Sequence, residues 1–169
     1  YSVTLRVDSL LRAAERAQAA AELDLVASAG ARGLSRTAEF LVPPEQLDRV
    51  LADFRELASE RRLMLQSVLV RKLRPEHETF LPWATRDWAG LTLRYFTRPT
   101  LGACVHATEI RRLLLDAVLA RGGSFPIGEA HLPTLAQYHA SYPTLSAFVA
   151  EKRRYDRAER LQNGWYRRV

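Results

Sequence analysis

The stretch TAEFLVPPEQLDRVLADFRELA, residues Thr37 to Ala58, changes from one secondary-structure pattern to another at its two prolines. Its first six residues, TAEFLV, form a short run that predicts a strand. Pro43 and Pro44 end that strand, and Pro44 suits the first turn of a helix. The residues that follow carry one apolar stripe at the helical period: Leu47, Val50, Leu51, Phe54, Leu57 and Ala58. The stretch therefore predicts a strand followed by an amphipathic helix.

Further along the chain, two more strands, a second helix and a last strand follow in an order that defines a fold class. Leu63–Leu73 and Leu91–Thr97 predict strands on either side of a long polar and aromatic loop. A second apolar stripe predicts a helix near residues 108–121, with Thr108 as its N-cap. SFPIG, Ser124 to Gly128, predicts the last strand. The order β-α-β-β-α-β is that of the ferredoxin-like fold, an α+β architecture in which both helices cover one face of a four-stranded antiparallel sheet.

Additional elements are expected at both ends of the chain. YSVTLRV, Tyr1 to Val7, alternates and predicts a strand, and residues 10–27 are in part helical by composition. Two short C-terminal helices are expected, one from Leu132 to about residue 139 and one from about residue 144 to Tyr155.

The composition is that of a globular protein and excludes several classes. The chain of 169 residues is long enough for one domain with a sizeable core. It has no apolar run of membrane-spanning length and no signal peptide, so we expect a cytoplasmic protein without a transmembrane segment. The single cysteine, Cys104, excludes an internal disulfide, and the four histidines lack metal-site spacing, so no metal is expected. Because the first residue is Tyr1, we expect a piece of a longer protein.

The net charge of +6 leaves two interpretations open. Much of the basic charge lies between Lys152 and Arg168, where seven basic residues face only Asp156 and Glu159. One interpretation is a solvated helix and tail. The other is a surface that faces phosphates or an acidic partner.

Two mid-strand arginines are the first candidate site residues. Side chains alternate between the faces of a strand, and the more polar sets are expected on the face without helices. An arginine in the middle of a strand is costly to bury, so Arg71 and Arg94 require water, an acid or an anionic ligand. Glu129, just past the last strand, could be that acid, and an ion-paired surface cluster is the alternative. The polar sets are Ser67, Leu69, Arg71, Thr92, Arg94 and Phe96.

Several segments, in this order, resemble the C-terminal part of FAD-linked oxidases of the vanillyl-alcohol oxidase superfamily. They are AEFLVPPEQLDRVL, LQSVLVRKL, WAGLTLRYF, LLLDAVLARGGSFPIGEAH and YPTLSAFVAEKRRYDRAERLQNGWYRR. The most similar branch includes alditol oxidase, gulonolactone-type oxidases and decaprenylphosphoryl-ribose oxidase. The resemblance implies that residues 1–35 are the end of the flavin domain with a connecting segment, and that residues 36–169 are the substrate (cap) domain. The open face of such a cap lies over the isoalloxazine ring, and FAD is bound mainly by a separate N-terminal domain.

The resemblance also implies site residues. Arg71 matches an active-site arginine, and Arg94 falls where alditol oxidase-like members carry an active-site histidine. Glu129 falls where many members carry a lysine beside the flavin, and His131 follows it closely. These four are the expected catalytic residues, whereas Asn163 matches an asparagine near the flavin and is the expected cofactor-binding residue.

Two positions depart from the family pattern. Leu69 stands where an acidic residue is expected, and Glu129 replaces the lysine. A lysine there would stabilise the reduced, anionic flavin ring. We expect Glu129 or His131 instead to act as a base that takes the hydroxyl proton while hydride leaves for flavin N5.

The expected function is therefore that of the substrate-binding domain of an FAD-dependent oxidoreductase. Its substrate would be a small-molecule alcohol, a polyol, sugar or related compound, oxidised at a CH–OH group. Its other partner would be the FAD-binding domain of the same polypeptide. The alternative is a stand-alone ferredoxin-like binding module for RNA or an acidic protein, although the strands lack an RNP-type aromatic motif and no nucleic acid is expected. A structural or regulatory remnant without chemistry is a third possibility.

Overall fold

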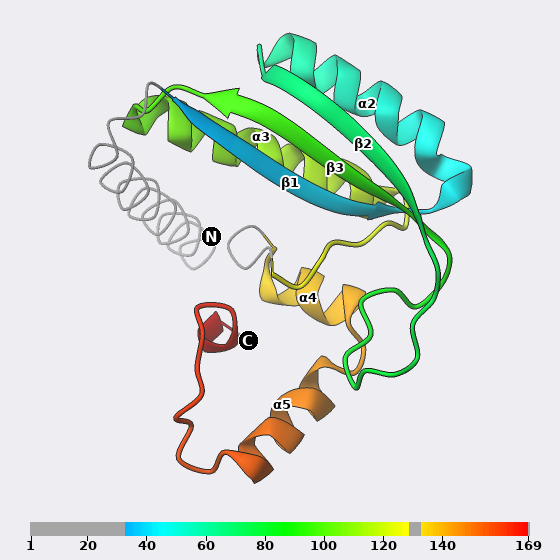
Figure 1. Cartoon of the computed structure of the whole chain (residues 1–169), viewed down its shortest axis with the longest axis vertical. Coiled ribbons are helices and arrows are strands. Elements are labelled where there is room, and N and C mark those ends of the chain that lie inside the picture. The colour runs from blue at the N-terminus through cyan, green and yellow to red at the C-terminus, as the bar shows by residue number, and fades with distance from the viewer. Residues whose placement is uncertain (1–32, 129–132, 169) are drawn as a thin grey trace, which may run out of the picture.

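The structure is a computed structural model that describes residues 33–128 and 133–168. Its centre is a three-stranded antiparallel sheet made of β1 (Leu34–Val42), β2 (Met64–Leu73) and β3 (Trp88–Thr97), in the order β1-β3-β2 (Figure 1). Helix α2 (Leu47–Glu60) connects β1 to β2, which are not neighbours in the sheet, and β3 lies between them and pairs with both. Three of the four strands predicted for the sheet are confirmed, each with slightly different ends.

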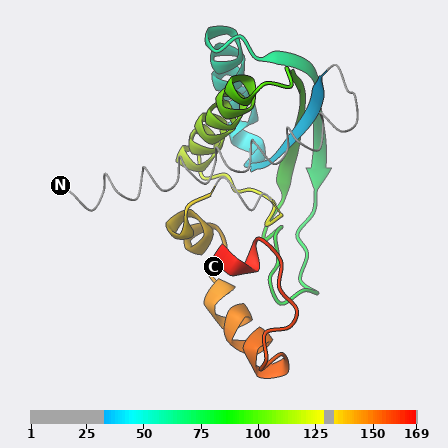
Figure 2. The same cartoon turned by 90° about the vertical axis from the view of Figure 1, so that its left-hand side faces the viewer.

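Two long helices cover one face of this sheet. The short 3-10 turn η1 (Pro44–Gln46) leads into α2 (Leu47–Glu60), and α3 (Leu101–Ala120) follows β3. Figure 2 shows both helices on the same side of the sheet, which leaves the other face free of helices. The mixed architecture and the one-sided helix layer are as predicted.

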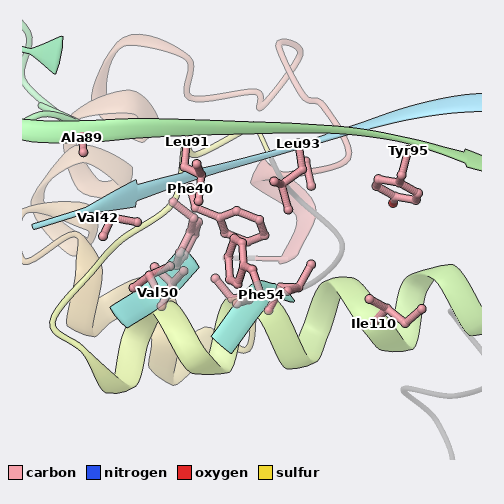
Figure 3. Close-up of a cluster of buried hydrophobic side chains, with 14 of the residues drawn as sticks. Phe40, Val42, Val50, Phe54, Ala89, Leu91, Leu93, Tyr95 and Ile110 are labelled. Atoms are coloured by element: carbon pink, nitrogen blue, oxygen red, sulfur yellow. The ribbon is translucent and has the colours of Figure 1, made fainter. Parts of the chain in front are cut away.

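The core lies between the central strand and the two helices. Ala89, Leu91, Leu93 and Tyr95 of β3 point toward α3, and Phe40 packs against Phe54 of α2 with ring centroids 5.3 Å apart (Figure 3). These alternate positions of β3 are buried because they face the helices. The intervening positions, Trp88 to Phe96 in steps of two, therefore face the helix-free side.

Strand β2 is an edge strand, and nearly all of it is exposed. Every residue from Met64 to Lys72 is classed as exposed, including Leu69 at 52%. Its register against β3 is interrupted between Leu65 and Ser67 by a bulge-like irregularity. Apolar residues on β2 therefore contribute little burial to the core.

The predicted fourth strand, Ser124–Gly128, is reduced to a single bridge. Ser124 N donates to Leu41 O and Leu41 N donates to Ser124 O, both at 2.8 Å, on the edge of β1 away from β3. The pairing stops there because Pro126 has no N–H to donate to a ladder. In addition, the Phe125 carbonyl accepts a hydrogen bond from the buried Tyr142 hydroxyl. The described sheet thus has three strands where four were expected.

Helix α3 begins earlier than predicted. Its N-cap is Thr100, whose Oγ1 accepts a hydrogen bond from Ala103 N at 3.3 Å, and not Thr108. Thr108 lies inside the helix and donates its hydroxyl to Cys104 O. The sequence pattern does not predict the first two turns, because they contain Gly102 and their buried residues, Cys104 and Ala107, are small.

The C-terminal helices are α4 (Leu135–Ser141) and α5 (Leu145–Tyr155), followed by the 3-10 turn η2 (Tyr166–Arg168). Helix α4 starts three residues later than predicted because Thr134 and Gln137 form a capping box. Tyr138 and Tyr142 are buried against Phe125, which joins these helices to the main core. The strand and helix expected within residues 1–27 lie outside the described residues.

Basic side chains of the C-terminal segment contact acidic and aromatic side chains of the same segment. Lys152 Nζ lies 2.7 Å from Asp156 Oδ2 and 4.1 Å from the centroid of the Tyr166 ring. Arg153 Nε lies 3.1 Å from Glu159 Oε1, which also accepts a hydrogen bond from the Tyr166 hydroxyl. These contacts favour the interpretation of a structured, solvated tail for this part of the charge.

Asp156 is expected to hold this turn in a pH-dependent way. A hydrogen bond from Lys152, followed by the backbone N–H groups of Leu161 and Arg160, lowers its pKa from 3.8 to about 2. Because the folded-state pKa is depressed, the stabilisation is present above the ordinary value and is lost as pH falls through about 2. Asp156→Asn should remove the same stabilisation at neutral pH. The backbone amides of Arg160 and Leu161 should then exchange their hydrogens faster. Asp48→Asn, on α2, is the control, and unchanged exchange in Asp156→Asn would contradict this role.

Candidate functional site

A small cavity opens on the helix-free face of the sheet. Its volume is about 210 Å³, and its polar lining comes from all three strands: Glu39 of β1, Thr92 of β3 and Arg71 of β2. The strand register brings these three side chains together, because Glu39 pairs with Thr92 and Arg71 pairs with the nearby Gly90. Three side chains remote in sequence thus converge on one point of the open face.

The three side chains form a loose hydrogen-bonded triangle. Arg71 Nη2 lies 3.4 Å from both Glu39 Oε1 and Thr92 Oγ1, and Thr92 Oγ1 donates to Glu39 Oε1 at 3.3 Å. The Arg71 and Glu39 side chains are 52% and 41% exposed. An ion pair this exposed contributes at most about 1 kcal/mol to stability. Its polar atoms can therefore exchange partners with a ligand at low cost.

The rest of the cavity lining is apolar and comes from the same three strands and from two residues outside them. Gly90, between Leu41 and Arg71 in the register, adds no side chain to the floor. Trp83, from the loop before β3, and Pro126, from the segment after α3, complete the rim. Apolar walls with a few convergent polar groups are typical of small-molecule sites.

Arg94 lies on the same face but outside this cavity. It pairs with Thr37 and Ser67, so it shares the face of Thr92. It is four residues from Gly90 along β3, or about 13 Å at the rise of a strand. Arg94 is exposed, and no contact between it and Arg71 is found in the described part of the chain. The two predicted arginines therefore share a face without meeting.

Of the remaining predicted site residues, Asn163 lies within the described part of the chain and does not line the cavity. Glu129 and His131 lie outside the described residues, although Pro126, three residues before Glu129, lines the cavity. Asn163 is placed in the C-terminal segment, where its Oδ1 accepts a hydrogen bond from Tyr166 N at 2.8 Å. Its side chain thus caps η2 and does not line the cavity.

Sequence reasoning missed Glu39, the acid that pairs with Arg71. The signal was available, since Thr37, Glu39 and Leu41 alternate with the apolar Ala38, Phe40 and Val42 in the first strand. What the sequence does not show is the strand order, which puts β3 between β1 and β2 and lets Glu39 reach Arg71. The sequence pattern indicated Glu129 as that acid instead.

A larger groove of about 760 Å³ lies near α4 and the loop before β3, but it offers fewer charged groups to a ligand. Arg86 is the one charged residue in the described part of its lining, and it stacks over Trp88 with Cζ 4.4 Å from the ring centroid. Arg86 Nη2 also donates to Gly122 O at 3.2 Å, and Nη1 lies 3.9 Å from Glu45 Oε1. Because the Arg86 guanidinium already contacts Trp88, Gly122 O and Glu45, this groove is the weaker candidate for a binding site.

Among residues 33–128 and 133–168, no group of three or more His, Cys, Asp or Glu side chains is arranged to hold a metal ion. Within the same residues, no helix combines the length and apolar character needed to cross a membrane.

Comparison with known proteins adds no assignment. No protein-family model matches the chain, and no curated protein matches it significantly.

Proposed function

We propose that the chain supplies the substrate-binding part of an FAD-dependent oxidoreductase that oxidises a CH–OH group of a polyol, sugar or related alcohol. The observation that carries the proposal is the Glu39–Arg71–Thr92 cluster beside a small cavity on the helix-free face. A cavity of about 210 Å³ suits a small hydroxylated molecule. The segment resemblance supports the same reading, with residues 36–169 as the substrate domain. In this proposal the domain is ferredoxin-like, and the single bridge between Ser124 and Leu41 stands at the position of its fourth strand.

The polar corner of the cavity would bind and orient the alcohol. Arg71 donates to substrate oxygens, the Glu39 carboxylate accepts hydrogen bonds from substrate hydroxyls, and Thr92 can do either. Holding the alcohol in the reacting geometry accelerates the reaction, because the entropy of bringing the reacting groups together is lost on binding. The hydroxyl proton needs a base within hydrogen-bond reach. Glu129 or His131 is proposed for that role.

The described residues fit a flavin only at its edge. Arg71 is an exposed cation on the open face, and a cation is favourable beside a ring that becomes anionic on reduction. The sequence contains no G-x-G-x-x-G loop for a pyrophosphate, so FAD would be held mainly by another domain of the same polypeptide. When bound, FAD would supply the hydride acceptor.

The alternative of an RNA-binding sheet is less well supported. The central open-face positions of β1 and β3 are Thr37, Glu39, Thr92 and Arg94. RNA-binding sheets of this kind stack bases on aromatic side chains at such positions. None of these four residues is aromatic. The aromatic residues of β3 on this face lie at its two ends, where Trp88 is buried and Phe96 is half-buried, and Glu39 would repel phosphate.

The proposal is tested with the polypeptide that carries this chain together with its flavin. Mixed anaerobically with a series of polyols and sugars, it should lose its flavin absorbance at a saturable rate with at least one of them. The 169-residue chain alone, mixed with FAD, should emerge colourless from gel filtration. Stoichiometric yellow flavin on the chain alone would contradict the placement of FAD on another domain. Absence of bleaching with every alcohol tried would contradict the proposed reaction.

A further inference from the structure

A second small pocket lies at the other end of the sheet and has a different character. It has a volume of about 230 Å³ and is formed by the start of β2, the end of β3 and the first half of α3. Its charged or titratable lining residues are Arg62, Arg98 and His106, and its described lining includes no Asp or Glu. Met64, Phe96 and Ile110 are among the apolar side chains beside them. The pocket thus joins positive charge to an apolar wall.

Arg62 occupies a backbone conformation that favours glycine. It follows the C-terminal end of α2 with φ of 51°, in the left-handed region. Leu63 N donates to Ala58 O at 2.9 Å and Arg62 N to Ser59 O at 3.2 Å, the bonding pattern of a Schellman motif. An arginine is less stable than glycine at this position because its Cβ approaches the backbone. A residue kept in a strained conformation is a reason to look for a function of its side chain.

His106 fixes this turn against α3. Its Nε2 lies 2.9 Å from Arg61 O, at the end of α2. A carbonyl oxygen only accepts, so Nε2 carries the hydrogen and donates. This bond holds the imidazole at the pocket and leaves Nδ1 for another partner.

The two arginines of the pocket have no acidic partner in the described part of the chain. Other arginines are paired, for example Arg121 with Asp53 at 2.6 Å and Arg153 with Glu159 at 3.1 Å. No such ion pair is formed by Arg62 or Arg98 within residues 33–128 and 133–168. Guanidinium groups match the oxygens of phosphate in geometry and charge.

We propose that this pocket binds the phosphomonoester group of a small organic molecule. Arg62 and Arg98 hold the phosphate oxygens, His106 closes the third side, and the apolar wall takes the organic group. The pocket is six residues along β3 from Gly90, or about 20 Å, so it is separate from the cavity at Arg71. The proposal does not rest on the flavin hypothesis.

The decisive variant is Arg62→Gly, which removes the cation and relieves the backbone. The full 169-residue chain, labelled with ¹⁵N, is titrated with phenyl phosphate and followed by NMR. Saturable shifts are expected at the amides of Arg98, Ala103 and His106, with weaker binding of inorganic phosphate. Arg62→Gly should weaken phenyl phosphate binding roughly tenfold or more, the scale of a charged hydrogen bond, without lowering the melting temperature. Arg98→Ala should weaken it similarly.

The control is Arg55→Ala, which removes the same charge from α2 outside the pocket. It should bind phenyl phosphate as the unaltered chain does. A separate arm uses vesicles containing phosphatidic acid, whose headgroup is also a phosphomonoester. Binding to these vesicles without binding to phenyl phosphate, again lost in Arg62→Gly, would assign the group to a lipid. Absence of both interactions, or equal loss in Arg55→Ala, would overturn the proposal.

Discussion

Replacing Arg71 by alanine is expected to slow reduction of the flavin by the alcohol roughly a hundredfold or more, the scale seen when one preorganised donor is removed. The expectation applies to the polypeptide that carries this chain with its flavin domain. Arg71 is the cation of the open-face cavity, within 3.4 Å of both Glu39 and Thr92. Its loss would leave the substrate oxygen without a charged donor. Retention of FAD should change little, because the flavin is proposed to be held by another domain.

Lys72→Ala is the matched control for this experiment. Lys72 is the next residue on β2, so its side chain points to the opposite face, and its Nζ lies 3.7 Å from Asp87 Oδ2. Rapid-reaction measurement of flavin bleaching separates the two variants, with Lys72→Ala close to the unaltered rate. An unchanged rate in Arg71→Ala would remove the cavity from the proposed reaction. Loss of flavin in that variant would instead point to a role in cofactor binding.

Phe40→Ala should destabilise the fold severely, by about 3 to 5 kcal/mol of unfolding free energy. Phe40 is 3% exposed and packs edge-on against Phe54. Truncation removes buried apolar surface and leaves a cavity between β1 and α2. Since domains of this size are stable by only about 5 to 15 kcal/mol, the variant would lose a large part of its stability.

The control for Phe40→Ala is Leu69→Ala on the exposed edge strand. Leu69 is also a large apolar residue in a strand, but it is 52% exposed. Its truncation should cost less than about 1 kcal/mol, since little buried surface is lost. Urea denaturation followed by circular dichroism measures both. Equal losses in the two variants would mean that the sheet is covered on both faces.

The sequence predicted the strands of the sheet correctly where polar and apolar side chains alternate clearly. The prediction was wrong where a proline and a distant hydrogen bond prevent strand pairing. Phe40 and Val42 alternate with Glu39 and Leu41, and the structure places the two sets on opposite faces. Ser124 to Gly128 looked equally strand-like, yet Pro126 and the bond from Tyr142 to Phe125 O limit it to one bridge. The second of these causes lies 17 residues away in sequence, so local pattern could not show it.

The sequence by itself determined three strands, the two long helices and the faces of their side chains, because the periods of 2 and 3.6 residues are local properties of the chain. It therefore predicted that Arg71 and Arg94 would share a polar face. Only the tertiary structure decided which groups meet on that face. Placing β3 between β1 and β2 joins Glu39 to Arg71 across Thr92, and keeps Arg94 several residues away. Strand order depends on how helices α2 and α3 bury the apolar side of the whole sheet, which is a property of no single segment.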